Sequence, residues 1–320
     1  MKKSKIRQHH VFRHYLTAWS EDGQVWVLGR GKVFRSNVTN VAVEKEFYKL
    51  REITPEDIAL VKALAIESLP QVLQARCLEF VEVFCLPIEM RRRIDPVDAR
   101  YAKERAYLDE AIVNTEEDFH CRIEDSLVPT LRDMLDGRID FFFDDERAAQ
   151  FLHAICLQYM RTKKRREALW SLGRTPVAGS DIRRAGNLLS QILAFVMGWS
   201  LYRDRALFRI ALVDNETEIP FIAGDQPIIN LHAKLGNGVT ERLEFYYPLS
   251  PNKAMLLLEA SHARTPVVSE DEVRELNALI VQNSHEQVFS NSREYLETIN
   301  GEPSQKMGSE QGNDSPNSHQ

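Results

Sequence analysis

The chain has 320 residues, of which 43% are hydrophobic and 28% charged, and its formal net charge is −6. A chain of this length and composition can bury a large core, as ordinary globular proteins do. The acidic balance excludes an overall basic field that would attract nucleic acid or an acidic membrane, but it does not exclude a local basic patch.

Three features predict a cytoplasmic protein with no membrane segment. No stretch approaches the roughly 20 apolar residues that a membrane helix needs. The basic residues 1–10 are not followed by an apolar segment of signal-peptide length. The four cysteines lack paired metal-binding spacing, which favours reduced, buried thiols.

The N-terminal region is expected to form a helix followed by a hairpin. Residues 9–19 repeat aromatic and apolar side chains at helical spacing. The short runs 25–28 and 33–35 flank Gly29-Arg30-Gly31, the pattern of a β-hairpin. Because an isolated hairpin is marginally stable in water, we expect it to dock on the C-terminal sheet and bring the chain ends together.

The middle of the chain is expected to be a helical insert over about residues 54–200. Thr54 and Pro55 provide an N-cap and a proline at the first helical position. The apolar periodicity predicts helices over about 54–86 with an interruption at Pro70, 97–112, 116–135 behind a Thr115 cap, 146–170 and 181–200. Two further helices are expected near 269–281 and 291–298.

Between these helices, residues of about 206–259 carry the signature of an antiparallel sheet. Runs at 208–213, 219–222, 228–231, 243–247 and 254–258 are each bounded by Asp, Asn, Gly or Pro. The predicted fold class is α+β, with one domain over residues 1–300. Residues 301–320 contain almost nothing apolar and are expected to form a disordered tail.

Several segments together resemble a known family. They are His9-His10 with Tyr15-Leu16, residues 41–48 (VAVEKEFY), Gln158 with Arg161 and Thr162, residues 221–227 (FIAGDQP) and residues 247–251 (YPLSP). Over roughly residues 9–292 the chain is similar to the bacterial and fungal family catalogued as domain of unknown function 4238. That family usually has Ser where this chain has Gly224 and Asn where it has Gln226. The resemblance implies no activity, and a chemical role for that Ser hydroxyl would be missing here.

Asp225 and His10 are the candidate catalytic residues. Asp225 lies at a strand-to-turn junction in Gly224-Asp225-Gln226-Pro227, where a partly buried carboxylate can act as a general acid or base. The alternative is structural, because an Asp in such a turn commonly accepts backbone N–H groups. His10 and His14 are four residues apart, a spacing that can grip a metal on a helix, but no further ligand motif supports a metal site.

Gln158, Arg161 and Arg165 are the candidate ligand-binding residues. Arg161 and Arg165 belong to the only dense basic run, residues 161–166, and Gln158 precedes that run by three residues. The three side chains would share one face of a continuous helix. Such a face could bind a phosphate or carboxylate by bidentate contact. The alternative is a solvated helix end, or a pair between Arg161 and a buried acid such as Asp225.

These candidates lead to three functional hypotheses. In the first, His10, Gln158, Arg161 and Asp225 converge in one cleft that binds or acts on a phosphate-bearing ligand. In the second, the chain is a non-enzymatic interaction or sensor protein, connected with antiviral defence or mobile elements, in which the same residues are structural. The third and weakest is a nuclease. The cofactor stays unknown, and the expected partner is a small anionic ligand or a protein.

Overall fold

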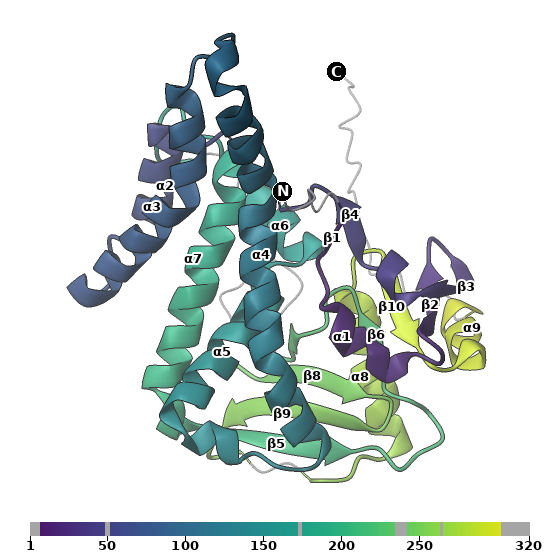
Figure 1. Ribbon diagram of the computed structural model, residues 1–320. Helices are drawn as coiled ribbons and strands as arrows, with labels where there is room; N and C mark the ends of the chain where they lie inside the picture. Colours follow the sequence, from purple (N-terminus) through teal and green to yellow (C-terminus); the bar gives the residue numbers. More distant parts are fainter. Residues whose placement is uncertain (1–6, 49–51, 172–174, 234–241, 263–264, 302–320) are drawn as a thin grey trace, which may run out of the picture.

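The computed structural model of the chain describes residues 7–48, 52–171, 175–233, 242–262 and 265–301. Long helices lie on one side of the molecule and the strands on the other (Figure 1). The α+β class predicted from the sequence is confirmed. The tail expected over residues 301–320 lies outside the described residues, apart from Gly301. Within the described residues, no helix combines the length and the apolar character that crossing a membrane requires.

The N-terminal segment is less helical than its periodicity predicts. Strand β1 (Arg7–His9) pairs antiparallel with β4 (Val43–Lys45), so the helix begins only at α1 (Arg13–Leu16) and continues as η1 (Thr17–Trp19). The indole N–H of Trp19 donates to the carbonyl oxygen of Phe221 at 2.8 Å. The N-terminal segment is thereby attached to the strand region more than 200 residues later.

The predicted hairpin is present as β2 (Gln24–Gly29) and β3 (Lys32–Asn37). Arg30 and Gly31 both have positive φ, as a two-residue turn matching the strand twist requires. β2 pairs with β10 (Gln287–Ser290), which pairs with β6 (Ala223–Gly224). The hairpin therefore pairs with strands from the C-terminal half of the chain, in a four-stranded sheet of order β3-β2-β10-β6. This sheet is separate from the one formed by most of the strands predicted over 206–259.

A second sheet has the order β5-β9-β8-β7, formed by β5 (Phe208–Asp214), β9 (Lys253–Glu259), β8 (Phe245–Ser250) and β7 (Ile229–Asn230). The strand predicted over 219–222 is wrong. The N–H of Phe221 donates to the Pro251 carbonyl at 2.8 Å and that of Ile222 to the Asn277 side chain at 3.1 Å. This segment is therefore buried coil that leads into β6.

The helical insert differs from the prediction in its boundaries. The helices are α2 (Pro55–Ala65), α3 (Gln71–Arg93), α4 (Ala102–Leu135), α5 (Asp145–Met160), α6 (Lys163–Trp170) and α7 (Ile182–Arg203). α4 is continuous where two helices were predicted, because Thr115 does not cap: its hydroxyl donates to the Ala111 carbonyl at 2.7 Å within the helix. The helix predicted over 146–170 is interrupted at Arg161 and Thr162.

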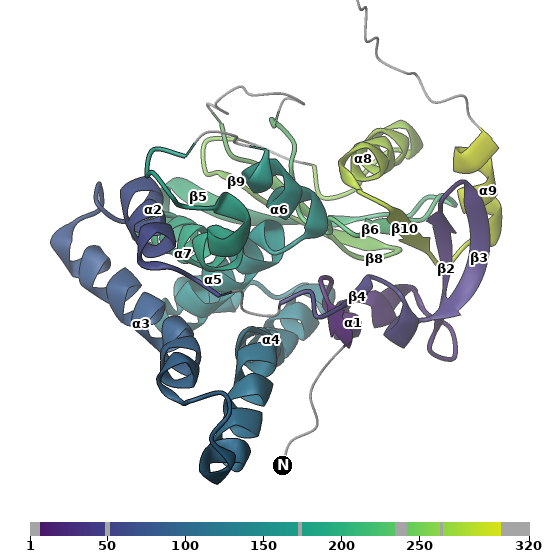
Figure 2. The same cartoon turned by 90° about the horizontal axis from the view of Figure 1, so that it is seen from above.

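Two helices follow the sheet strands, α8 (Glu270–Asn283) and α9 (Arg293–Gly301). The remaining short turns of 3₁₀ helix are η2 (Val38–Asn40), η3 (Ala99–Tyr101), η4 (Asp140–Phe143) and η5 (Arg205–Leu207). Seen from above, α8 and α9 lie beside the strands, on the far side of the molecule from α3 (Figure 2). One buried cluster joins α1, α4 and α5 to β8 and β9, and a second lies between α2, α3 and α7.

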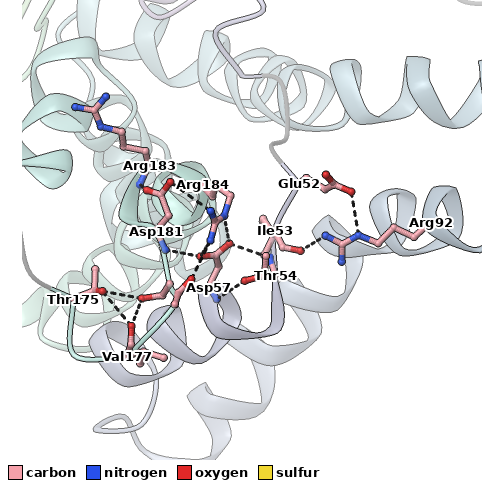
Figure 3. A network of polar contacts seen from close by, with 12 residues as sticks. Glu52, Ile53, Thr54, Asp57, Arg92, Thr175, Val177, Asp181, Arg183 and Arg184 are labelled. Carbon is pink, nitrogen blue, oxygen red and sulfur yellow. Dashed lines mark hydrogen bonds and ion pairs between the residues drawn. The ribbon is translucent and has the colours of Figure 1, made fainter.

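A polar network holds the second cluster together (Figure 3). Asp57 is fully buried and accepts hydrogen bonds from the backbone of Thr54 (3.0 Å) and Asp181 (2.7 Å) and from Arg184 Nε (2.7 Å). The N-cap predicted at Thr54 is confirmed, and Thr54 and Asp57 together form a capping box. Since these partners come from the first turns of α2 and α7, the network fixes the two helices side by side.

Candidate functional site

The interruption between α5 and α6 places Arg161 in the interior. Arg161 is 3% exposed, and its Nη2 binds both the Glu124 carboxylate of α4 and Gln158 Oε1, the latter at 2.7 Å. Burial alone would lower the pKa of Arg161, but the neighbouring Glu124 carboxylate raises it above its usual value. The alternative considered from the sequence was a pair between Arg161 and a buried acid such as Asp225, whereas the acid that Arg161 binds is the partly buried Glu124.

The rest of the basic run also binds other segments. Lys163 Nζ lies 2.8 Å from Glu44 and 2.9 Å from Glu286. Lys164 Nζ donates to the Gln282 carbonyl at 2.7 Å, and the Arg165 guanidinium stacks 4.1 Å above the Tyr159 ring. Arg166 Nη1 donates to the Phe47 carbonyl at 2.7 Å. The single face predicted for Gln158, Arg161 and Arg165 does not form, because the helix breaks between them.

Asp225 is held by the backbone that follows α8. Its Oδ1 accepts the N–H of His285 at 2.6 Å, and its Oδ2 accepts those of Glu286 (2.7 Å) and Gln287 (3.0 Å). Burial raises the pKa of Asp225, and the three N–H donors oppose that rise. Hydrogen bonds connect His10, Gln158 and Arg161, whereas Asp225 is bonded to the 285–287 segment. A catalytic role for Asp225 remains a prediction.

Gln226 is the residue of this turn that reaches the α5–α6 junction. Its Oε1 accepts a short hydrogen bond from the Thr162 hydroxyl, and its Nε2 donates to the Ile228 carbonyl at 2.7 Å. A Cβ added at Gly224 would lie 2.2 Å from Ser284 Oγ. The two positions where this chain departs from the family pattern are thus both closely packed.

His10 is buried against Phe47, with ring centroids 5.3 Å apart. Its carbonyl oxygen accepts the Gln158 side-chain amide at 3.2 Å, and its Nδ1 has no hydrogen-bond partner. Burial, helped by the Arg161 charge, lowers the pKa of His10 to about 3, so its imidazole is neutral. Because His10 lies outside α1, it does not share a helix face with His14. The catalytic role predicted for His10 is untested by these contacts.

A pocket of about 430 Å³ lies between the N-terminal segment and α4. We call it the α1–α4 pocket. One wall is formed by His9, Phe12, Arg13, His14 and Thr17. The opposite wall consists of α4 residues one helical turn apart, Glu117, Cys121, Glu124, Asp125 and Val128. The first wall carries the cation and imidazoles, whereas the second carries the carboxylates.

His9 is a partly buried histidine in the lining of the α1–α4 pocket. It donates to the backbone of Thr39, while its Nε2 is buried with no hydrogen-bond partner. Burial lowers its pKa, so the ring is neutral at pH 7. A neutral imidazole that donates from Nδ1 keeps an acceptor lone pair on Nε2. His9 thus lines the α1–α4 pocket, and its Nε2 is an unpartnered acceptor enclosed within the protein.

Two smaller cavities adjoin the α1–α4 pocket. A space of about 10 Å³ shares Phe12 and Glu124 with it and is also lined by Gln158 and Arg161. Glu124 therefore lies between the α1–α4 pocket and Arg161. The Nε of Arg161 is buried without a hydrogen-bond partner. A second cavity, of about 140 Å³, shares His14 and Thr17 with the pocket and has an apolar lining of Tyr15, Ala18, Leu131, Leu135 and Leu249, with Arg132.

The inward face of α4 carries a separate buried polar cluster. Glu116 Oε1 accepts from Gln191 Nε2 at 3.1 Å, and the same amide nitrogen lies 3.0 Å from His120 Nε2. Burial raises the pKa of Glu116 to about 7 and lowers that of His120 well below its usual value. The Tyr48 ring packs on His120 at 4.4 Å. Within the described ranges, no group of three or more His, Cys, Asp or Glu side chains is arranged to hold a metal ion.

The acids of α4 were missed at the sequence level. Glu116, Glu117, His120 and Glu124 follow one another at spacings of one, three and four residues, which divides them between two adjacent helix faces. That spacing was visible in the sequence and could have identified these residues. The opposite wall of the pocket could not be predicted, because nothing local indicates that residues 9–17 pack across α4.

Comparison with known proteins gives a family match. A family model described as Protein of unknown function (DUF4238) matches residues 7–176 and 196–294, and so includes both walls of the α1–α4 pocket. The resemblance drawn from the sequence is thereby confirmed. Comparisons with curated proteins and with solved structures gave no match.

Proposed function

The chain belongs to the family described as Protein of unknown function (DUF4238), and we propose that it binds a small phosphate ester in the α1–α4 pocket. The observation that carries the proposal is the opposite chemistry of the two walls. Arg13, with His9 and His14, faces a wall that bears Glu117, Glu124 and Asp125. A ligand that fits must therefore present an anionic group to one wall and hydrogen-bond donors to the other.

A phosphate ester of a hydroxylated or amino-bearing molecule meets both requirements. Its phosphate would accept from the Arg13 guanidinium, which has the planar donor geometry that phosphate recognition uses. Its hydroxyl or amino groups would donate to the carboxylates of α4, because an ionised carboxylate accepts hydrogen bonds and cannot donate them. The volume of about 430 Å³ lies in the range of small-molecule sites.

The adjoining apolar cavity extends the ligand class. Since it shares His14 and Thr17 with the α1–α4 pocket, a ligand held at Arg13 can extend an aromatic or aliphatic group toward Leu131 and Leu249. Nucleoside monophosphates combine a phosphate, hydroxyl donors and an aromatic base, and they are the compounds we would test first.

Arg161 has a positioning role in this proposal. Because it lies behind Glu124, it neutralises part of that carboxylate's charge and fixes the direction in which Glu124 meets the ligand. Gln158 Oε1 accepts a hydrogen bond from the same Nη2 of Arg161 at 2.7 Å. His9 lines the pocket, and a turn of its ring on ligand binding would let the enclosed, unpartnered Nε2 accept a proton from a ligand hydroxyl.

The experiment is a thermal-shift comparison of phosphate esters with their dephosphorylated counterparts, for example adenosine 5′-monophosphate with adenosine. A ligand at 100 times its Kd stabilises the folded state by about 2.7 kcal/mol, or roughly 5 °C for a chain of this size. We expect the ester to raise Tm and the nucleoside to have a much smaller effect.

The matched variants are Arg13→Gln at the pocket wall and Arg122→Gln on α4, where Arg122 is exposed and not part of the pocket lining. The first should reduce the ester-induced shift and the second should leave it unchanged. Equal behaviour of the two variants, or the absence of any phosphate-dependent shift, would count against the proposal. Binding without turnover of any ester would place the chain among sensor proteins.

A further inference from the structure

Helix α3 has two apolar stripes, one buried within the described chain and one exposed to solvent. The buried stripe faces α4 and α7 and consists of Leu73, Cys77, Val81, Phe84, Cys85 and Ile88. The second stripe is exposed to solvent: Val72 is 75% exposed, Val83 62%, Leu86 53% and Met90 47%. An amphipathic helix packed on one core needs a single apolar stripe, so the second has no partner within the described chain.

The exposed stripe has the spacing of a helix-pairing seam. Its positions alternate by four and three residues: Val72, Arg76, Glu79, Val83, Leu86, Met90 and Arg93. This is the 3.5-residue period with which one helix packs along another. Val83, Leu86 and Met90 form an apolar centre of the seam, with Arg76 and Glu79 before them and Arg93 after them.

The opposite charges of Glu79 and Arg93 indicate which helix packs on this seam. Glu79 precedes Leu86 by seven residues and Arg93 follows it by seven, so the two lie on the same face about 10 Å to either side. An isologous contact repeats each pairing through its two-fold axis. With the axis at Leu86 and the helices antiparallel, Glu79 of each copy faces Arg93 of the other. We infer that α3 forms an antiparallel pair with α3 of a second copy of this chain.

The position of α3 allows this pairing. Figures 1 and 2 both show α3 along the side of the molecule away from the strands, meeting α4 at one end and diverging from it along its length. With the axis at Leu86, residues 79–93 of the two helices overlap over a length of about 20 Å. Its C-terminal end is fixed, because Arg92 Nη2 donates to the Ile53 carbonyl at 2.6 Å (Figure 3). The pair would bring together two helices that are already formed in the single chain, each with Pro87 inside it.

Existing contacts leave the charges of the seam available. Glu79 pairs with Arg76 one turn away at 3.0 Å, but both side chains are more than 60% exposed, and such pairs contribute little. A pairing at the edge of an apolar seam is better shielded from water. The exchange of partners therefore favours the contact between copies.

The test is the mass of the full chain by light scattering coupled to size exclusion, at protein concentrations up to about 100 µM. We expect a mass approaching twice the 36.9 kDa of one chain at the upper concentrations. Leu86→Glu places two like charges at the two-fold axis and should shift the equilibrium to monomer, with at least a tenfold weaker Kd. The control is Leu207→Glu in η5, where the side chain is 65% exposed and away from the seam; it should keep the dimer.

A charge exchange tests the antiparallel register. Glu79→Arg alone and Arg93→Glu alone should each weaken the dimer, because each places like charges opposite one another. The double variant should recover the wild-type Kd, an outcome that destabilisation of the monomer cannot produce. A monomeric wild type would overturn the inference and leave the seam to a different protein. A dimer that survives Leu86→Glu, or a double variant no tighter than the single ones, would overturn it as well.

Discussion

Replacing Asp225 by asparagine tests whether this carboxylate is structural. Its two oxygens accept three backbone N–H groups, those of His285, Glu286 and Gln287, at 2.6 to 3.0 Å. Asn has a single acceptor oxygen. If that oxygen keeps the two donors of Glu286 and Gln287, the amide NH₂ faces the N–H of His285, and a donor then opposes a donor.

The size of the effect follows from these contacts. Hydrogen bonds to a charged group contribute about 1.5–3 kcal/mol each, and a buried N–H left without an acceptor costs about 1–3 kcal/mol. We therefore expect Asp225→Asn to lower the free energy of unfolding by about 3 kcal/mol, which for a chain of this size is about 6 °C in Tm.

The assay is thermal unfolding followed by circular dichroism, with Asp95→Asn as the control. Asp95 is exposed and accepts the Val97 N–H at 2.9 Å, a contact that the Asn oxygen can keep. The control should change stability by less than about 0.5 kcal/mol. An Asp225→Asn protein as stable as wild type, or more stable, would refute the structural reasoning and return Asp225 to the candidate catalytic residues.

Three other substitutions test separate parts of the account. Burial raises the folded-state pKa of Glu116 from 4.5 to about 7, so stability should fall by roughly 3 kcal/mol as pH rises through this range, and Glu116→Gln should remove that slope in urea unfolding. Gly224→Ala should destabilise the fold by about 1–3 kcal/mol, since its Cβ would lie 2.2 Å from Ser284 Oγ, and adding Ser284→Ala should recover most of the loss in Tm. His9→Asn keeps a donor for Thr39 but removes the Nε2 lone pair, so calorimetry should show about tenfold weaker binding of a phosphate ester.

Local chemistry made part of the fold predictable. The helix starts at Thr54 and Ser269 follow from capping residues within four positions, and both capping boxes are present. The hairpin follows from the Gly-Arg-Gly turn between two apolar runs. The error at Thr115 has a local cause too, because a threonine hydroxyl can bond back to the preceding turn instead of capping a new helix.

The remaining errors arise from contacts between distant segments. The run at 219–222 has the composition of a strand, but its N–H groups bond to Pro251 and Asn277, which no local pattern reveals. The same holds for the candidate site. The sequence predicted that His10, Gln158, Arg161 and Asp225 converge; hydrogen bonds connect the first three, and the carboxylate that Arg161 binds is that of Glu124 on α4.

The most direct measurement for the central proposal is nuclear magnetic resonance of the histidine side chains during titration with adenosine 5′-monophosphate. The chain has nine histidines, and single His→Gln variants assign their signals. If the α1–α4 pocket binds the ester, the signals of His9 and His14 shift with ligand concentration while those of His262 and His285, which are not in the pocket lining, stay in place. Unchanged His9 and His14 signals at saturating ester, or equal shifts at all four histidines, would contradict the proposal.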